Sequence, residues 1–169
     1  MVISEAYRAL NAKLHQQRAD YGCRGGRHAE RVRELLRAHR ANSVLDYGAG
    51  KGGLKAALPN IDVREYDPAI PGKDRPPQPA DILVCTDVLE HVEPECIADV
   101  LKQLASLTIK AGHIVVATKP DGSKKLPDGR DPHLIVESPE WWERKLSDHF
   151  RVRCEAVGKR DVTFTVWPL

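Results

Sequence analysis

Apolar residues along the chain follow two alternating patterns. Short continuous apolar runs predict buried strands at 43–48, 81–86 and 113–118. Apolar positions spaced three or four residues apart predict amphipathic helices at 4–20, 27–39, 53–58, from about 94 to 104, and at 138–150. Strands that alternate with helices indicate an α/β fold, in which a mostly parallel sheet is covered by helices on both faces.

Further segments complete the predicted sheet. Residues 62–67 alternate between apolar and polar types, as a strand does. The last two apolar segments, 151–158 and 160–169, predict an antiparallel C-terminal strand pair around a Gly-Lys turn. Residues 68–80 hold five prolines in thirteen positions, which fits neither a helix nor a central strand. We therefore expect an irregular connection there.

Composition narrows the class of protein. A length of 169 residues predicts one domain, with an N-terminal helical cap over 1–42 and a core over 43–169. The net charge of +2 is too small to indicate a nucleic-acid-binding protein. Four widely spaced cysteines predict free thiols in a reducing compartment. Because the chain lacks an apolar signal core and any 18-residue apolar run, we expect a cytoplasmic protein without a membrane span.

A glycine-rich turn follows the first buried strand. Gly48, Gly50 and Gly53 allow a sharp turn and a close approach to a ligand, and Asp67 follows the next strand, 19 residues after Gly48. A carboxylate at that place can accept the two hydroxyl protons of a ribose. A nicotinamide dinucleotide fits the glycines, but Asp46 would repel its pyrophosphate. The ammonium and sulfonium of S-adenosylmethionine suit this carboxylate better.

At this point the motifs carry a family resemblance. The series "VLDYGAGKGG", "REYDP", "ADILVCTDVLEHVEP" and "GHIVVATKP", over about residues 43–120, resembles class I S-adenosylmethionine-dependent methyltransferases. The resemblance implies a Rossmann-like core whose glycine loop holds the methionine part of the cofactor and whose Asp67 holds the ribose. The cofactor-binding residues that it implies are Tyr21, Asp46, Gly48, Ala49, Gly50, Asp67, Pro68, Asp87 and Val88.

The sequence departs from this family at one place. Only the proline-rich segment 68–80 lies where the family has a helix and its third strand. We therefore predict that the third family strand is missing and that the sheet has about six strands. The family residue that reads the adenine amino group follows that strand, so Asp81 and segment 68–80 are candidates to replace it.

An acidic block with one histidine follows the second apolar run. Asp87, Glu90 and His91 are spaced i, i+3, i+4, so in a helix their side chains would share one face. His133 lies in a loop after the adjacent predicted strand and is expected to face them. Two carboxylates and two histidines suit Mn²⁺, Fe²⁺ or Zn²⁺, and Mg²⁺ less well. A histidine that acts as general base is the competing hypothesis.

Two metal-using groups within the family have a similar arrangement. Small-RNA 3′-end 2′-O-methyltransferases and ubiquinone-pathway O-methyltransferases carry an acid-x-x-Glu-His motif. The resemblance implies Asp87, Glu90, His91 and His133 as catalytic residues and metal ligands, with Asp87 in the place of the usual glutamate.

We therefore expect O-methylation of a small or sugar-like hydroxylated acceptor, assisted by a divalent metal. A second hypothesis is a nucleic-acid 2′-O-methyltransferase, because of the metal-like pattern and the arginines that surround the helix at 27–39. The third is a nicotinamide-dependent oxidoreductase. One of Trp141 and Trp142 is expected in the core, and the other is free to stack on an acceptor. Neither the acceptor nor the oligomeric state follows from the sequence.

Overall fold

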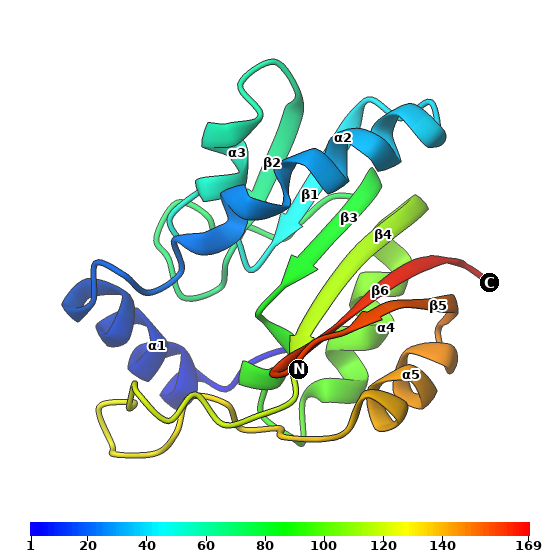
Figure 1. Cartoon of the computed structure of the whole chain (residues 1–169). Coiled ribbons are helices and arrows are strands. Elements are labelled where there is room, and N and C mark those ends of the chain that lie inside the picture. Colours follow the sequence, from blue (N-terminus) through cyan, green and yellow to red (C-terminus); the bar gives the residue numbers. More distant parts are fainter.

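A six-stranded sheet forms the centre of the computed structural model, which describes residues 1–169 (Figure 1). Its strand order is β2-β1-β3-β4-β6-β5. The strands are β1 Ser43–Tyr47, β2 Asp62–Tyr66, β3 Ala80–Thr86, β4 Thr108–Ala117, β5 Phe150–Val157 and β6 Asp161–Pro168. Strands β1 to β4 pair in parallel, whereas β6 pairs antiparallel with both β4 and β5. The predicted fold class and the antiparallel C-terminal pair are confirmed.

Five α-helices accompany the sheet. They are α1 Glu5–Gln17, α2 Ala29–Ala38, α3 Gly53–Ala57, α4 Ile97–Leu107 and α5 Pro139–Ser147. Two 3₁₀ turns, η1 Arg24–His28 and η2 Leu89–His91, precede α2 and α4. Helix α5 begins with Ser138 as its N-cap, whose side chain accepts a hydrogen bond from the Trp141 N–H, and with Pro139 in its first turn.

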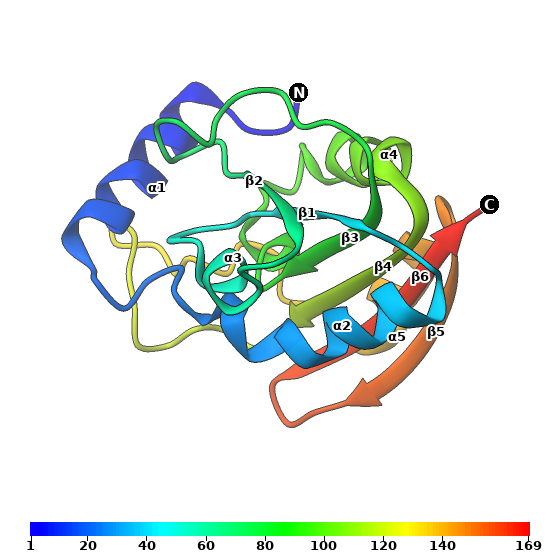
Figure 2. The same cartoon turned by 90° about the horizontal axis from the view of Figure 1, so that it is seen from above.

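Each face of the sheet packs against its own pair of helices, and Figures 1 and 2 show the two layers. Strand β3 is buried on both sides because its residues alternate between the layers. Ile82 and Val84 join the core under α2 and α3. Leu83 and Cys85 join the larger core under α4 and α5, which also contains Trp142. This double burial explains why the sequence of β3 is one continuous apolar run.

The proline-rich segment 68–80 forms no regular element before β3 begins at Ala80. No strand lies outside β2, so β2 is one edge of the sheet. The predicted absence of the third family strand is confirmed. None of the helices is long and apolar enough to cross a membrane.

Helix α1 packs beside the long loop that joins β4 to α5. Tyr7 and Leu14 of α1 form a small core with Leu126 of that loop. The helix is also tied to the segment after η2, because the Glu93 carboxylate accepts hydrogen bonds from Ser4 N–H at 2.7 Å and from Ser4 Oγ at 2.6 Å. Glu93 is therefore an anchor for α1, and not simply an acid at a helix start.

Candidate active site

A cavity of about 460 Å³ lies over the carboxyl ends of β1, β3 and β4. All nine residues predicted to bind the cofactor line this cavity, and so do Glu90, His91 and His133. Residues from α1, from the segment before α2 and from the loop after β4 complete its wall. The cavity thus joins the glycine-rich turn at one end to the acidic block at the other.

The glycine-rich turn is packed too closely for larger residues. Gly48 has φ +80° and Gly50 has φ +51°, both in the left-handed region that disfavours residues with a Cβ. A Cβ at position 48 would overlap the side chain of Val88, and one at position 50 would overlap the carbonyl oxygen of Gly22. The turn therefore touches both the segment after β3 and the segment that precedes α2.

Asp67 ties the end of β2 to this turn. Its Oδ2 accepts a hydrogen bond from Gly50 N–H at 3.0 Å, and its Oδ1 accepts one from Ala69 N–H at 3.0 Å. A carboxylate has about four acceptor positions, so both oxygens can accept further protons from a ligand. The side chain is buried and lines the cavity, as a ribose-binding carboxylate must.

Asp46 lies in the cavity wall and forms no ion pair. It is only 4% exposed, and its Oδ2 has no hydrogen-bond partner. Burial raises the pKa of this carboxyl to about 7; the nearby Glu65 adds to the rise, and Lys73 opposes it. A buried carboxylate of this kind favours a positively charged ligand group beside it.

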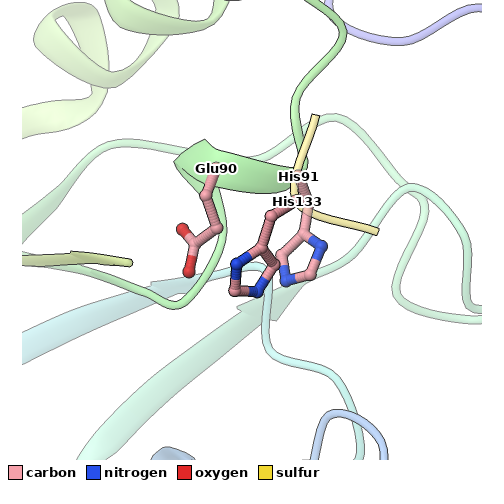
Figure 3. A group of neighbouring side chains, drawn as sticks. All are labelled: Glu90, His91 and His133. Carbon is pink, nitrogen blue, oxygen red and sulfur yellow. The ribbon is translucent and has the colours of Figure 1, made fainter. Parts of the chain in front are cut away.

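Glu90, His91 and His133 form a compact group at the other end of the cavity. One possible ligand atom from each residue lies within 4.8 Å of the others. Glu90 and His91 come from η2, whereas His133 comes from the loop after β4. Figure 3 shows the carboxylate and the two imidazole rings on the same side of the η2 turn. This is a two-histidine, one-carboxylate donor set, which suits a divalent transition metal.

Both histidines are oriented through their other ring nitrogen. The Nδ1 of His91 lies 2.8 Å from the carbonyl oxygen of Pro132, and that of His133 lies 2.7 Å from the carbonyl oxygen of Lys119. A carbonyl can only accept, so we assign the proton of each ring to Nδ1. A ring with its proton on Nδ1 keeps a free lone pair on Nε2. Such backbone partners are typical of histidines that bind metal ions.

The electrostatics of the group agree with this donor set. Burial, and secondly the neighbouring His133, lowers the pKa of His91 to about 4, so its ring stays neutral at physiological pH. Burial, and secondly the charge of Asp87, raises the pKa of Glu90 to about 8. Glu90 is fully buried; its Oε1 accepts from Ala117 N–H at 3.2 Å, but its Oε2 has no partner. A divalent cation would offset this buried, half-satisfied carboxylate, so the residues fit a metal.

Asp87 lies outside this group. It has φ +56° and precedes a 3₁₀ turn, so the helical spacing that predicted its convergence with Glu90 and His91 does not apply. Its Oδ2 instead accepts a hydrogen bond from the guanidinium of Arg27 at 2.7 Å. Arg27 also donates from Nε to His28 Nε2 at 3.0 Å. The ion pair holds the segment before α2 against the cavity mouth.

Helix α1 contributes cavity residues that the sequence analysis does not anticipate. Tyr7, Asn11 and His15 follow one another at intervals of four residues and line the cavity. The hydroxyl of Tyr7 and the Nδ1 of His15 are buried without partners. Polar and aromatic residues at i, i+4 and i+8 were the available signal, because they share one helical face. Tyr21 packs edge-on against both His15 and His91, at ring-centroid distances of 4.7 and 5.9 Å.

Several predicted candidates have structural roles. Three arginines of α2 are paired with glutamates: Arg31 with Glu34 and Glu155, and Arg33 and Arg37 with Glu30.

Asp81 accepts from Asn42 N–H at the opposite end of the sheet and therefore cannot read an adenine. Trp142 is buried, and Lys145 covers the Trp141 ring at 5.5 Å.

Comparisons with solved structures place this geometry among known folds. The chain is 17% identical to a Burkholderia thailandensis 1,6-didemethyltoxoflavin-N1-methyltransferase bound to S-adenosylhomocysteine, with a TM-score of 0.66 over 99% of this chain and 91% of that one. DhpI, also bound to S-adenosylhomocysteine, is 17% identical, with a TM-score of 0.66 over 98% of each chain.

Other similar structures differ in length. One match is a Nostoc punctiforme protein that carries the name of an O-methyltransferase, at 15% identity and a TM-score of 0.57. It covers 84% of this chain but only 56% of that protein. No protein-family model and no curated protein matches the chain. The strand order, the glycine-rich turn and these structural relatives together show that the chain has the fold of the class I S-adenosylmethionine-dependent methyltransferases.

Proposed function

We propose that the protein is an S-adenosylmethionine-dependent methyltransferase that acts on an oxygen of a small or sugar-like hydroxylated acceptor, with a divalent metal held by Glu90, His91 and His133. The observation that carries this proposal is the convergence of three ligand atoms within 4.8 Å, in the same cavity as Asp46 and Asp67.

The cofactor end of the cavity offers complementary groups for each part of S-adenosylmethionine, which would supply the methyl group. Buried Asp46 suits the ammonium or sulfonium, and the remaining acceptor positions of Asp67 suit ribose hydroxyls. A pyrophosphate would meet an uncompensated carboxylate at Asp46. The nicotinamide hypothesis is therefore the weaker one.

The acceptor end is defined by Glu90 and the two histidines. Their free Nε2 atoms and the unpartnered Glu90 Oε2 can hold the ion, and three protein ligands leave positions for acceptor oxygens. A bound divalent ion would lower the pKa of an acceptor hydroxyl. The hydroxyl would give up its proton to solvent and its oxygen would form a bond to the methyl carbon, while the carbon–sulfur bond breaks and its electron pair stays on the sulfur of S-adenosylhomocysteine. Asp87 does not belong to this ligand set, because Arg27 holds it.

A small acceptor is favoured over a nucleic acid. Phosphate contacts need exposed cations, and three arginines of α2 are already paired with glutamates. Salt-dependent retention on single-stranded RNA at physiological ionic strength would overturn this part of the proposal.

The test measures S-adenosylhomocysteine and Mn²⁺ binding by calorimetry. It is followed by methyl transfer to hydroxylated sugars and catechols, with and without a chelator. His133→Ala should abolish Mn²⁺ binding, whereas the matched control His149→Ala, which lies outside the cavity, should not. Unchanged methyl transfer after complete chelation would rule out a role for the metal and would favour His91 as the proton acceptor. Failure to bind S-adenosylhomocysteine would remove the methyltransferase.

A further inference from the structure

Lys73 lies in the proline-rich segment 68–80 and is not among the cofactor-binding residues that the family resemblance implied. Its ammonium donates to the carbonyl oxygen of Gly50 at 2.8 Å and to Glu65 Oε1 at 2.9 Å. The side chains of Lys73 and Glu65 are only 21% and 17% exposed. Lys73 does not line the cavity, so its contacts reach the cofactor end only through Gly50.

The backbone of Lys73 reaches the same place by a second route. Its carbonyl oxygen accepts from Asp67 N–H at 3.0 Å, and Asp67 Oδ2 in turn accepts from Gly50 N–H at 3.0 Å. Gly50, Asp67 and Lys73 are therefore joined in a closed ring of hydrogen bonds. The ring connects Asp67, which the proposed function assigns to the ribose, with the glycine-rich turn that lines the same cavity.

The segment around Lys73 is built to hold this geometry. Ile70 N–H donates to the Asp67 carbonyl, and Lys73 N–H donates to the Ile70 carbonyl at 3.0 Å, so residues 67–73 form a tight double turn. The prolines of segment 68–80 limit its backbone freedom further. Within the turn, the Gly50 carbonyl accepts a charge-assisted hydrogen bond from Lys73, which fixes the orientation of this peptide.

We propose that Lys73 is a positioning residue for the cofactor: it clamps the Gly50 carbonyl so that the glycine-rich turn and Asp67 are preorganised for S-adenosylmethionine. The inference rests on the proposed function. It gives the segment that replaces the missing family strand a role in cofactor affinity.

The experiment compares Lys73→Met with Lys55→Met by calorimetry with S-adenosylhomocysteine. Methionine keeps the apolar stem of lysine but not its charge. Lys55 is the matched control because its ammonium approaches the same Glu65, at 3.9 Å, and donates no hydrogen bond to the turn. We expect Lys73→Met to raise Kd about tenfold, as for one lost charge-assisted hydrogen bond, and Lys55→Met to leave it within about twofold.

Lys73→Arg provides the conservative variant. It should restore part of the affinity, because a guanidinium can still donate to the carbonyl. In methyl transfer, Lys73→Met should raise KM for S-adenosylmethionine and leave kcat nearly unchanged, which a general loss of stability would not produce. Circular dichroism at the assay temperature checks that each variant is folded. If Lys73→Met does not fold, the affinity of Lys73→Arg is compared with that of Lys55→Met instead.

Four results would overturn the inference. In the first, Lys73→Met binds as tightly as the wild type. In the second, Lys73→Met and Lys55→Met lose affinity equally, which would assign the effect to the charge of Glu65. In the third, Lys73→Met does not fold, and Lys73→Arg loses no more affinity than Lys55→Met. In the last, the wild type itself does not bind S-adenosylhomocysteine, which would also remove the proposed function and is distinguishable for that reason.

Discussion

Replacing Asp46 by asparagine should stabilise the unliganded protein and weaken cofactor binding at the same time. The carboxyl is 4% exposed, its Oδ2 has no partner, and burial raises its pKa from 3.8 to about 7. In the folded state it therefore binds its proton more tightly than in the unfolded state. Stability from this group falls as pH rises from about 4 to about 7, and then stays constant.

The size of the effect follows from the pKa shift of about three units. At 1.36 kcal/mol per unit, the ionised carboxylate costs about 4 kcal/mol of folding free energy above pH 7, and less than half of that at pH 5. Asparagine has the same shape and no charge. The gain in stability from Asp46→Asn should therefore be about 3 kcal/mol larger at pH 8 than at pH 5.

The assay is urea unfolding of both proteins at pH 5 and pH 8 without ligand, with Asp148→Asn as the control at an exposed acid outside the cavity. Calorimetry with S-adenosylhomocysteine tests the predicted change in cofactor affinity. Wild-type affinity should rise about tenfold from pH 6 to pH 8, as Asp46 ionises, and that of Asp46→Asn should stay flat. A stability difference that is the same at both pH values would refute the reasoning.

Three further changes probe other parts of the structure. Gly50→Ala should destabilise the protein by about 1–3 kcal/mol and weaken S-adenosylhomocysteine binding, because a Cβ overlaps the Gly22 carbonyl; thermal unfolding and calorimetry test this. Trp142→Ala should cost about 3–5 kcal/mol in urea unfolding, and Trp142→Phe much less, because the buried indole N–H has no partner to lose. Glu93→Ala should release α1, so hydrogen exchange in residues 5–17 should speed up while that in β3 stays slow.

The hydrophobic pattern predicts the sheet because most of its strands are buried on both faces. In β3, neighbouring apolar residues enter opposite cores, so their run is continuous and easily recognised. Strand β4 is harder to predict from the sequence. It begins at Thr108, but Lys110 and Gly112 interrupt the apolar run, and the prediction begins only at 113. Pairing with β3 extends it where the sequence alone gives no signal.

The site is predictable only where its residues stand next to a strand end. Asp46 is the last residue but one of β1, and Asp67, Glu90 and His91 follow β2 and β3 closely, so their place at the carboxyl edge comes from topology. The position of Asp87 depended on an α-helix that the chain does not form there. Lys73 and the face of α1 depend on how distant segments pack, and local patterns carry no information about that.

Strand β2 leaves one side of the sheet without a neighbour. An open edge invites a strand from another molecule, and proteins counter this with short, charged edge strands. Strand β2 has five residues, among them Asp62 and Arg64, and the Arg64 guanidinium donates both to Asp62 and to the carbonyl oxygen of Pro79. Because the outer strand is missing, we expect the charges of Asp62 and Arg64 to keep the β2 edge from pairing with a strand of another molecule.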